Sequence, residues 1–189
     1  ADPQVLATLF HFHTLCWGKS LFMKDHYIPK WNNSLTERVL ELFPDKTAGK
    51  LRMLFLTVQK DAEQLFKPDC WISADPNPTN WGVRKDGTVV LFDWERITTG
   101  SPAIDLAITI PGVGTADNSL ETLIANRYLT MGAERSFSFP FSERDLVRRI
   151  KLAKLWSVVE FLGNNSASLD LDIFRELVTK LPAKFAELV

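Results

Sequence analysis

Cysteine and an excess of either charge are what this sequence most clearly lacks. Its two cysteines, Cys16 and Cys70, lie far apart in the chain and form no Cys-x-x-Cys pair. This excludes a disulfide framework and argues against a zinc knuckle or a redox pair, so we expect two reduced thiols in a cytoplasmic protein. The 22 basic and 23 acidic residues leave a net charge of −1. No basic field is therefore available to neutralise nucleic-acid phosphates, and nucleic acid is not an expected partner.

Long uninterrupted apolar segments are also missing. The stretch over residues 9–17 contains two histidines and is far too short for a transmembrane helix. No basic region precedes an apolar run and a small-residue cleavage site, as it does in a signal peptide. We predict no membrane partner. The chain opens with Ala1 rather than with methionine, which is expected of a fragment, a processed product or a cloning remnant.

What the sequence does contain is a globular composition, with 46% hydrophobic and 24% charged residues, and a strong helical periodicity. Apolar residues recur at spacings of three and four, which predicts amphipathic helices. Ser34 and Ser142 open two of these helices with capping-box patterns, and the last helix is interrupted near Pro182. The predicted helices span residues 5–17, 34–43, 47–66, 118–131, 142–162 and 170–188. Without a linker or an internal repeat, residues 1–189 are predicted to form one helical lobe, mainly α with a small β-hairpin (α+β).

The exception to the helical pattern lies in residues 70–95. Asp86-Gly87 is flanked by strand-like segments, which predicts a β-hairpin with a two-residue turn because glycine tolerates a positive φ. This turn places Asn80 opposite Asp93 at the open end of the hairpin. Directly opposed residues of an antiparallel pair have Cα atoms about 4.5–5.5 Å apart. The hairpin is thus predicted to present an amide oxygen beside a carboxylate, a donor pair that suits Mg²⁺.

A further carboxylate, Asp75, begins the proline-containing loop that ends at Asn80, and this loop can bring it towards the same point. Taken singly, such polar residues are what turns and strand ends commonly contain. The set is harder to explain in that way, because Asp93 follows the apolar run 89–92 and precedes Trp94. A carboxylate among apolar neighbours requires a partner or a metal.

Three ordered segments resemble the aminoglycoside phosphotransferase and choline kinase family, whose members share the protein-kinase-like fold. Residues 72–81, ISADPNPTNW, are similar to its catalytic loop, which typically reads His-Gly-Asp, three further residues often including proline, and then Asn. Residues 91–95, LFDWE, are similar to its Ile-Asp-Trp-Glu segment. Residues 100–107, GSPAIDLA, are similar to its Gly-Asp-Pro-x-x-Asp-Leu-Ala block. Upstream, residues 9–17 resemble the family's helix carrying Leu-His and an aromatic residue.

The resemblance implies that the chain is the C-terminal lobe of a kinase-like enzyme that moves the γ-phosphate of ATP to a hydroxyl of a small molecule, antibiotic- or choline-like. Asp75 would be the catalytic base that accepts the proton of that hydroxyl. Asn80 and Asp93 would hold Mg²⁺ on the ATP phosphates, in agreement with the predicted register. Asp105 would support the catalytic loop by accepting its hydrogen bonds, and Ser73 would support it from the family's histidine position. No nucleotide-binding residue is assigned.

The sequence departs from the family pattern in two places. Ser73-Ala74 replaces His-Gly before the catalytic aspartate, which removes a scaffold residue but no reacting group. No glycine-rich phosphate loop or strand lysine precedes the catalytic loop. We therefore expect the nucleotide-clamping N-terminal lobe to be supplied in cis or by a partner chain, and these 189 residues to be inactive alone. The alternative is a non-catalytic binding or regulatory module with a kinase-like fold.

Other polar residues carry weaker signals. His11 and His13 point in different directions on a helix and cannot share a metal, so at least one is expected to be a packed core histidine. The basic run over 144–154 predicts a solvated helix face with an ion pair between Asp145 and Arg149. The acidic residues beyond position 117 are not dense enough to indicate an aminoglycoside substrate; among them are Glu121, Glu160, Asp170 and Asp172.

Overall fold

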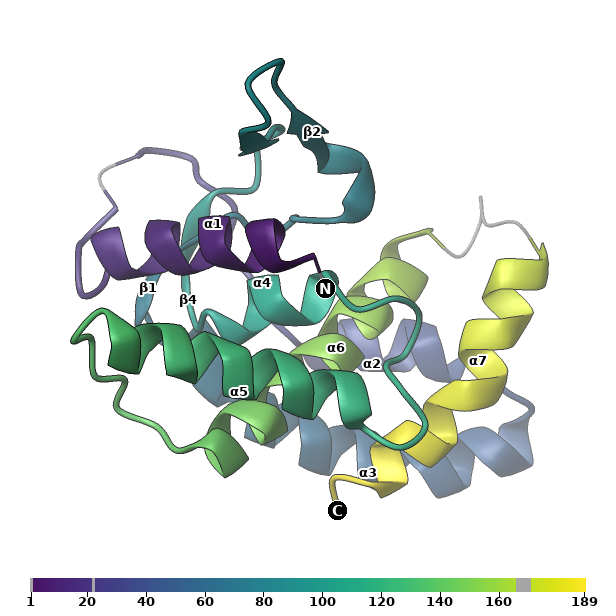
Figure 1. The fold of residues 1–189 in the computed structure, drawn as a ribbon. Coiled ribbons are helices and arrows are strands. Elements are labelled where there is room, and N and C mark those ends of the chain that lie inside the picture. Colours follow the sequence, from purple (N-terminus) through teal and green to yellow (C-terminus); the bar gives the residue numbers. More distant parts are fainter. Residues whose placement is uncertain (1, 22, 166–170) are drawn as a thin grey trace.

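The computed structural model describes residues 2–21, 23–165 and 171–189, and it shows a mainly helical fold with two small antiparallel sheets (Figure 1). The α-helices are α1 (Pro3–Leu15), α2 (Asn33–Leu40), α3 (Asp45–Ala62), α4 (Ala103–Ile108), α5 (Ser119–Glu134), α6 (Glu143–Asn165) and α7 (Leu171–Ala186). Two short 3-10 helices are η1 (Glu63–Phe66) and η2 (Pro78–Asn80). The strands are β1 (Cys70–Ile72), β2 (Trp81–Val83), β3 (Val89–Leu91) and β4 (Thr98–Gly100). The predicted class, mainly α with a small β-hairpin, is confirmed.

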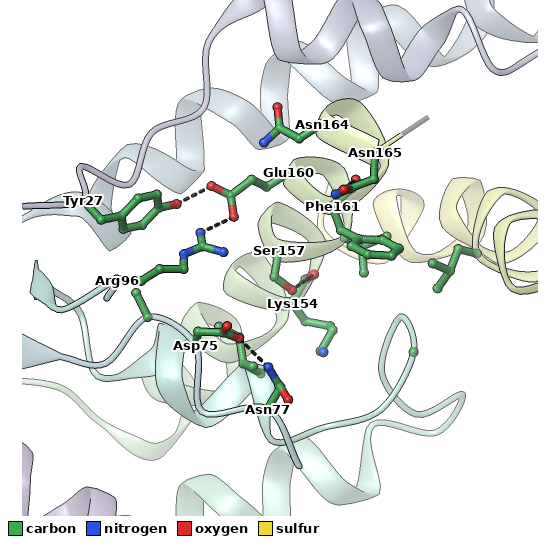
Figure 2. A pocket seen from close by; sticks show the side chains of 15 residues that line it. Tyr27, Asp75, Asn77, Arg96, Lys154, Ser157, Glu160, Phe161, Asn164 and Asn165 are labelled. Atoms are coloured by element: carbon green, nitrogen blue, oxygen red, sulfur yellow. Dashed lines mark hydrogen bonds and ion pairs between the residues drawn. The ribbon is translucent and has the colours of Figure 1, made fainter. Parts of the chain in front are cut away.

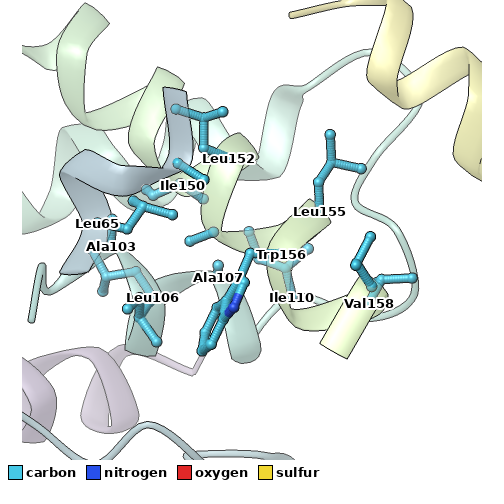
Figure 3. Close-up of a cluster of buried hydrophobic side chains, with 14 of the residues drawn as sticks. Leu65, Ala103, Leu106, Ala107, Ile110, Ile150, Leu152, Leu155, Trp156 and Val158 are labelled. Atoms are coloured by element: carbon cyan, nitrogen blue, oxygen red, sulfur yellow. The ribbon is translucent and has the colours of Figure 1, made fainter. Parts of the chain in front are cut away.

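Helix α6 lies at the centre of the packing and contacts α2, α3, α4, α5 and α7. Figure 3 shows its apolar side chains against those of α4, and Trp156 is the largest fully buried side chain of the group. The indole N–H of Trp156 donates to the backbone oxygen of Lys30 at 3.0 Å, so its one polar atom is satisfied inside the core. Because helices pack against several sides of α6, residues 152–156 in its middle are buried.

Helix starts follow local capping signals. At α6, the backbone N–H of Asp145 donates to Ser142 Oγ and the backbone N–H of Ser142 donates to Asp145 Oδ2, both at 3.2 Å. This reciprocal pair is the predicted capping box. At α2, however, the cap is Asn32, whose side chain accepts from the backbone N–H of Leu35 at 2.9 Å. The predicted capping role of Ser34 is therefore wrong, because an Asx cap two residues earlier takes its place.

Two other predicted helices differ in their ends or regularity. The helix expected over residues 47–66 begins earlier, at Asp45, and its last turn is the 3-10 helix η1. Pro182 lies inside α7 and does not interrupt it. The predicted start of this helix at Asp170 lies outside the described residues.

The two sheets frame the segment that carries the family motifs. Strand β1 pairs with β4, with Cys70 opposite Gly100, and strand β2 pairs with β3 in the hairpin. The hairpin turn has three residues instead of two, because the N–H of Arg84 donates to Thr88 O at 2.9 Å and Gly87 adopts a left-handed φ of 84°. Every pairing is thereby shifted by one residue from the predicted register, so Trp81 lies opposite Leu91.

Two predicted absences can be compared with the structure. Cys16 and Cys70 are free thiols, as the sequence predicted. Within the described ranges, no helix combines the length and the apolar character needed to span a membrane.

Candidate active site

The loop that follows β1 is closed by hydrogen bonds between its own residues. The side-chain amide of Asn77 donates to Asp75 Oδ1 at 2.8 Å, and that of Asn80 donates to the backbone oxygen of Asp75 at 2.9 Å. The indole N–H of Trp81 donates to Pro76 O at 3.0 Å. These bonds and two prolines limit the conformations of the loop and fix the half-buried Asp75 carboxylate at its head.

Buried Asp105 holds the other side of this loop. Its carboxylate accepts hydrogen bonds from the backbone N–H groups of Ser73 at 2.9 Å and Ala74 at 2.8 Å. It also contacts His13 Nε2 at 3.0 Å, and His13 Nδ1 contacts the hydroxyl of Tyr128 at 2.9 Å. Since a carboxylate only accepts, we assign the proton to His13 Nε2, so that Nδ1 accepts from Tyr128. The side chain of Asp105 thus joins the loop to helices α1 and α5 through partners that are themselves buried.

These contacts bear on two of the predicted site residues and on a histidine. Asp105 lies where the resemblance placed the support of the catalytic loop. Ser73 is also buried, and its hydroxyl accepts a long hydrogen bond, 3.4 Å, from the backbone N–H of Asp75. The expectation that His11 or His13 is a packed core histidine is confirmed for His13, which is fully buried.

Ala74 has a backbone conformation that is unusual for alanine. Its φ is +59°, in the left-handed region, and its side chain is fully buried. A non-glycine residue pays about 1–2 kcal/mol for this conformation. The two hydrogen bonds from Ser73 and Ala74 to Asp105 hold the strained peptide in place. The family's glycine at this position would adopt the same conformation without strain.

The predicted metal ligands Asn80 and Asp93 lie close to each other along the hairpin but do not face each other. The backbone N–H of Phe92 donates to Asn80 O at 2.7 Å, so Asn80 is opposite Phe92 and Asp93 follows one residue later. The expectation that Asp93 is embedded among apolar neighbours is also wrong, because Phe92, Asp93 and Trp94 are all exposed.

The donor chemistry of this pair still fits Mg²⁺. Asp93 has a left-handed φ of 54°, and among the described residues its carboxylate has no hydrogen-bond or ion-pair partner. Asn80 donates its amide N–H to the backbone oxygen of Asp75, and its side-chain oxygen accepts only a long hydrogen bond, 3.5 Å, from the hydroxyl of Thr79. Mg²⁺ typically takes one or two protein oxygens and completes its shell with phosphates and water. The described part of the chain holds no cluster of three or more His, Cys, Asp or Glu side chains able to bind a metal by themselves.

A pocket of about 730 Å³ opens beside Asp75 (Figure 2). The Asp75–Asn77 loop forms one wall and α6 forms the opposite wall, with contributions from Gly112 and from Leu177 of α7. The side chains that line the pocket from successive turns of α6 are Lys154, Ser157, Phe161 and Asn164, and in Figure 2 Lys154 lies nearest to the loop. A pocket of this size can hold a small metabolite.

One end of the pocket contains an ion pair that the sequence did not predict. Arg96 Nη2 lies 2.6 Å from Glu160 Oε2, and the guanidinium sits over the ring of Tyr27 at 4.2 Å from its centroid. The hydroxyl of Tyr27 donates to the other oxygen of Glu160. Burial and the adjacent Glu160 carboxylate raise the pKa of the Tyr27 hydroxyl. Arg96 and Glu160 are far apart in the chain, so no local pattern could have paired them.

The basic residues of α6 have other partners and a different exposure from those predicted. Arg148 pairs with Asp61 at 2.5 Å and Arg149 pairs with Asp69 at 3.2 Å, whereas Asp145 caps the helix instead of pairing with Arg149. Lys154 does not lie on a solvated face at all, because it is 6% exposed and lines the pocket. The sequence held a signal for this: Lys154 is a lone charge within the apolar stretch 152–156.

Comparisons with known proteins agree with this geometry. Residues 17–138 match the sequence profile of the "Phosphotransferase enzyme family". No curated protein sequence matches the chain. A solved choline kinase of Streptococcus pneumoniae superposes with a TM-score of 0.57 at 16% identity, over 97% of this chain and 62% of that one. A solved ethanolamine kinase of Plasmodium vivax superposes with a TM-score of 0.52 at 16% identity, over 98% of this chain and 50% of that one.

Two conclusions follow from these matches. At 16% identity the two structures show a common fold, and the chain spans only 62% and 50% of their lengths. The profile covers more than half of the chain and includes both the Asp75 loop and Asp105. The chain therefore belongs to the phosphotransferase enzyme family.

Proposed function

We propose that the protein containing this chain is a small-molecule kinase that transfers the γ-phosphate of ATP to an acceptor hydroxyl. The observation that carries the proposal is the Asp75 carboxylate, which lines a metabolite-sized pocket at the head of a loop held by buried hydrogen bonds. Phosphoryl transfer demands mainly positioning and charge stabilisation from a protein, and a rigid loop with a half-buried carboxylate meets the first demand.

Each residue of the site has a proposed role in this reaction. Asp75 accepts the proton of the acceptor hydroxyl as its oxygen attacks the γ-phosphorus and the bond to the leaving ADP breaks. Asn77 holds Asp75 Oδ1, which leaves Oδ2 for that proton. Asn80 and Asp93 would hold Mg²⁺, which neutralises charge on the ATP phosphates when bound. Asp105 keeps the loop in this geometry.

The rest of the ATP site is proposed to lie outside these residues. Both solved kinases are considerably longer than the part that this chain matches. We propose that a nucleotide-clamping lobe, in the same chain or in a partner, completes the site, and that the 189 residues alone are inactive. The free thiols Cys16 and Cys70 and the use of ATP support a cytoplasmic location. An antibiotic- or choline-like acceptor stays a prediction.

The proposal is tested on the full-length natural protein with Asp75→Asn, which removes the base but keeps the shape of the side chain. Loss of a general base is expected to lower kcat about 10²- to 10⁴-fold. Binding of Mg·ATP, measured by calorimetry, should be retained, because Asp75 does not hold the nucleotide. Asp45→Asn is the matched control, since Asp45 is exposed at the start of α3, and it should leave kcat unchanged.

A second variant separates catalysis from binding. Asp93→Ala is expected to weaken Mg·ATP binding itself at least tenfold, because it removes one of the two oxygen ligands. Binding of Mg·ATP without turnover in the unmodified protein would favour the non-catalytic module instead. Equal kcat values for Asp75→Asn and the unmodified protein would remove the assignment of the base.

A further inference from the structure

Lys154 places a positive charge inside the pocket, on the wall opposite Asp75. Its side chain leaves the middle of α6 and points towards the Asp75–Asn77 loop (Figure 2). The residue is 6% exposed, so its methylene stem is covered and its ammonium group borders the cavity. Long cationic side chains commonly cover their stem and keep the head group accessible, and Lys154 does so towards the pocket.

The ammonium group of Lys154 has no partner in the described part of the chain. No carboxylate oxygen there lies within 4.0 Å of its Nζ, and no hydrogen bond from Nζ is found. Glu121 acts on it electrostatically, but Glu121 accepts hydrogen bonds from the backbone N–H of Thr115 at 2.9 Å and from its hydroxyl. A buried charge without a partner is costly, and a bound anion would relieve that cost.

The other charged side chains of the pocket already have a partner or a proposed role. Arg96 and Glu160 neutralise each other at 2.6 Å, and Asp75 is reserved by the proposed function for the acceptor hydroxyl. Among the described lining residues, this leaves the positive charge of Lys154 without a neutralising group. One unbalanced charge is matched by a carboxylate, whereas a phosphate would bring a second negative charge close to Asp75. A quaternary ammonium acceptor would meet Lys154 as a like charge.

We infer that Lys154 is a specificity-determining residue that binds a carboxylate of the acceptor, so that the substrate is a small hydroxy acid. The inference rests on the proposed function, because the hydroxyl of the same molecule must reach Asp75. It departs from the choline-like acceptor expected from the sequence, since choline carries the opposite charge. Burial lowers the pKa of Lys154 to about 8, so the ammonium form that binds an anion prevails at neutral pH.

The experiment uses the full-length natural protein and a series of acceptors of equal chain length. Each acceptor carries one terminal hydroxyl and, at the other end, a carboxylate, a carboxamide, a phosphate or a trimethylammonium group. The carboxylate is expected to have the highest kcat/KM. Its kcat/KM should fall as the pH rises above about 8, because Lys154 loses its proton.

Lys154→Met removes the charge and keeps the length of the side chain. It should lower kcat/KM for the carboxylate about 30-fold or more, the usual effect of breaking a buried charge pair, and abolish the pH dependence above 8. The carboxamide should change less than about threefold. Lys151→Met is the matched control, because Lys151 lies on the same helix, carries the same charge and does not line this pocket.

Direct binding decides the inference even where turnover is absent. The hydroxy carboxylate alone, without nucleotide, should raise the melting temperature of the unmodified protein and of Lys151→Met, but not that of Lys154→Met. A preference for trimethylammonium or for phosphate, or equal carboxylate binding by Lys154→Met, would overturn the inference and leave the proposed kinase standing. Loss of Mg·ATP binding and of all turnover, with carboxylate binding intact, would instead remove the proposed function.

Discussion

Replacing Lys154 by methionine is expected to stabilise the protein, although the residue lies in its binding pocket. The pKa of Lys154 is lowered from 10.5 to about 8, chiefly by burial and against the attraction of Glu121. At about 1.4 kcal/mol per pH unit, this difference corresponds to about 3 kcal/mol by which the folded state disfavours the charged lysine. Methionine fills a similar volume without a charge, so it should recover most of that free energy.

The effect has a pH dependence whose sign is fixed by linkage. The folded protein has the lower pKa, so below pH 8 the lysine is charged in both states and the full cost of about 3 kcal/mol is present. Between pH 8 and 10.5 the unfolded state holds more protons, and the cost is relieved as the pH rises. The advantage of Lys154→Met should therefore shrink to about 1 kcal/mol at pH 10.

The measurement is urea unfolding of the full-length protein and of Lys154→Met at pH 7 and at pH 10, without ligand. Titration of cysteines and tyrosines affects both proteins equally and cancels in the difference between them. Lys151→Met should show no comparable gain, because Lys151 is only half-buried. The reasoning is refuted if Lys154→Met is less stable than the unmodified protein at pH 7, or if the difference between them is the same at both pH values.

Three further predictions test the support of the site and the packing around α6. Ala74→Gly should raise the free energy of unfolding by about 1 kcal/mol in chemical denaturation, because glycine adopts the φ of +59° without strain; a loss of stability would contradict the assigned conformation. Asp105→Asn should lower it by about 3–5 kcal/mol, because a buried charged acceptor of three hydrogen bonds is replaced by a group that also donates; a loss below 1 kcal/mol would show that the loop has another support. Gly163→Ala should lower the free energy of unfolding by about 1–3 kcal/mol, since the new Cβ would lie 2.5 Å from Leu35 Cδ1. Gly49→Ala has open space around it in α3 and should raise the free energy of unfolding by up to about 1 kcal/mol. If thermal unfolding shows Gly163→Ala to be the more stable of the two variants, close packing of α6 on α2 is excluded.

The helices could be predicted from the sequence because their signals are local. Apolar spacing and the Ser142–Asp145 capping box depend on residues within one or two turns of each other. The hairpin was also correctly located, but its register was wrong by one residue. Counting from Asp86-Gly87 assumed a two-residue turn, whereas a three-residue turn with left-handed Gly87 uses the same sequence. Side chains alternate between the two faces of a strand, so a slip of one residue changes every facing pair.

The site could be predicted only as far as its motifs reach. Asp75 and Asp105 could be proposed as site residues because each lies within a segment that resembles the family. The structure brings the peptide before Asp75 onto the Asp105 carboxylate. The pairing of His13 with Asp105 joins two distant parts of the chain, and no local periodicity specifies it. Lys154 was assigned to a solvated face because charge runs on helices usually are solvated, and only the packing of five helices around α6 reverses that assignment.

Backbone strain and polar groups without partners occur together around the pocket. Ala74 has a strained left-handed backbone. Lys154 has a largely buried side chain whose charge has no ion pair among the described residues. Arg96 Nε is the one buried side-chain nitrogen or oxygen of the described residues without a hydrogen bond. All three residues line the same pocket as Asp75. Strain and unpaired polar groups persist where a ligand or a reaction requires them, because substitutions such as Ala74→Gly or Lys154→Met would otherwise give a more stable protein. Their coincidence in the pocket that also contains the loop carboxylate argues that the pocket is maintained for binding, and that its polar groups are completed by the acceptor.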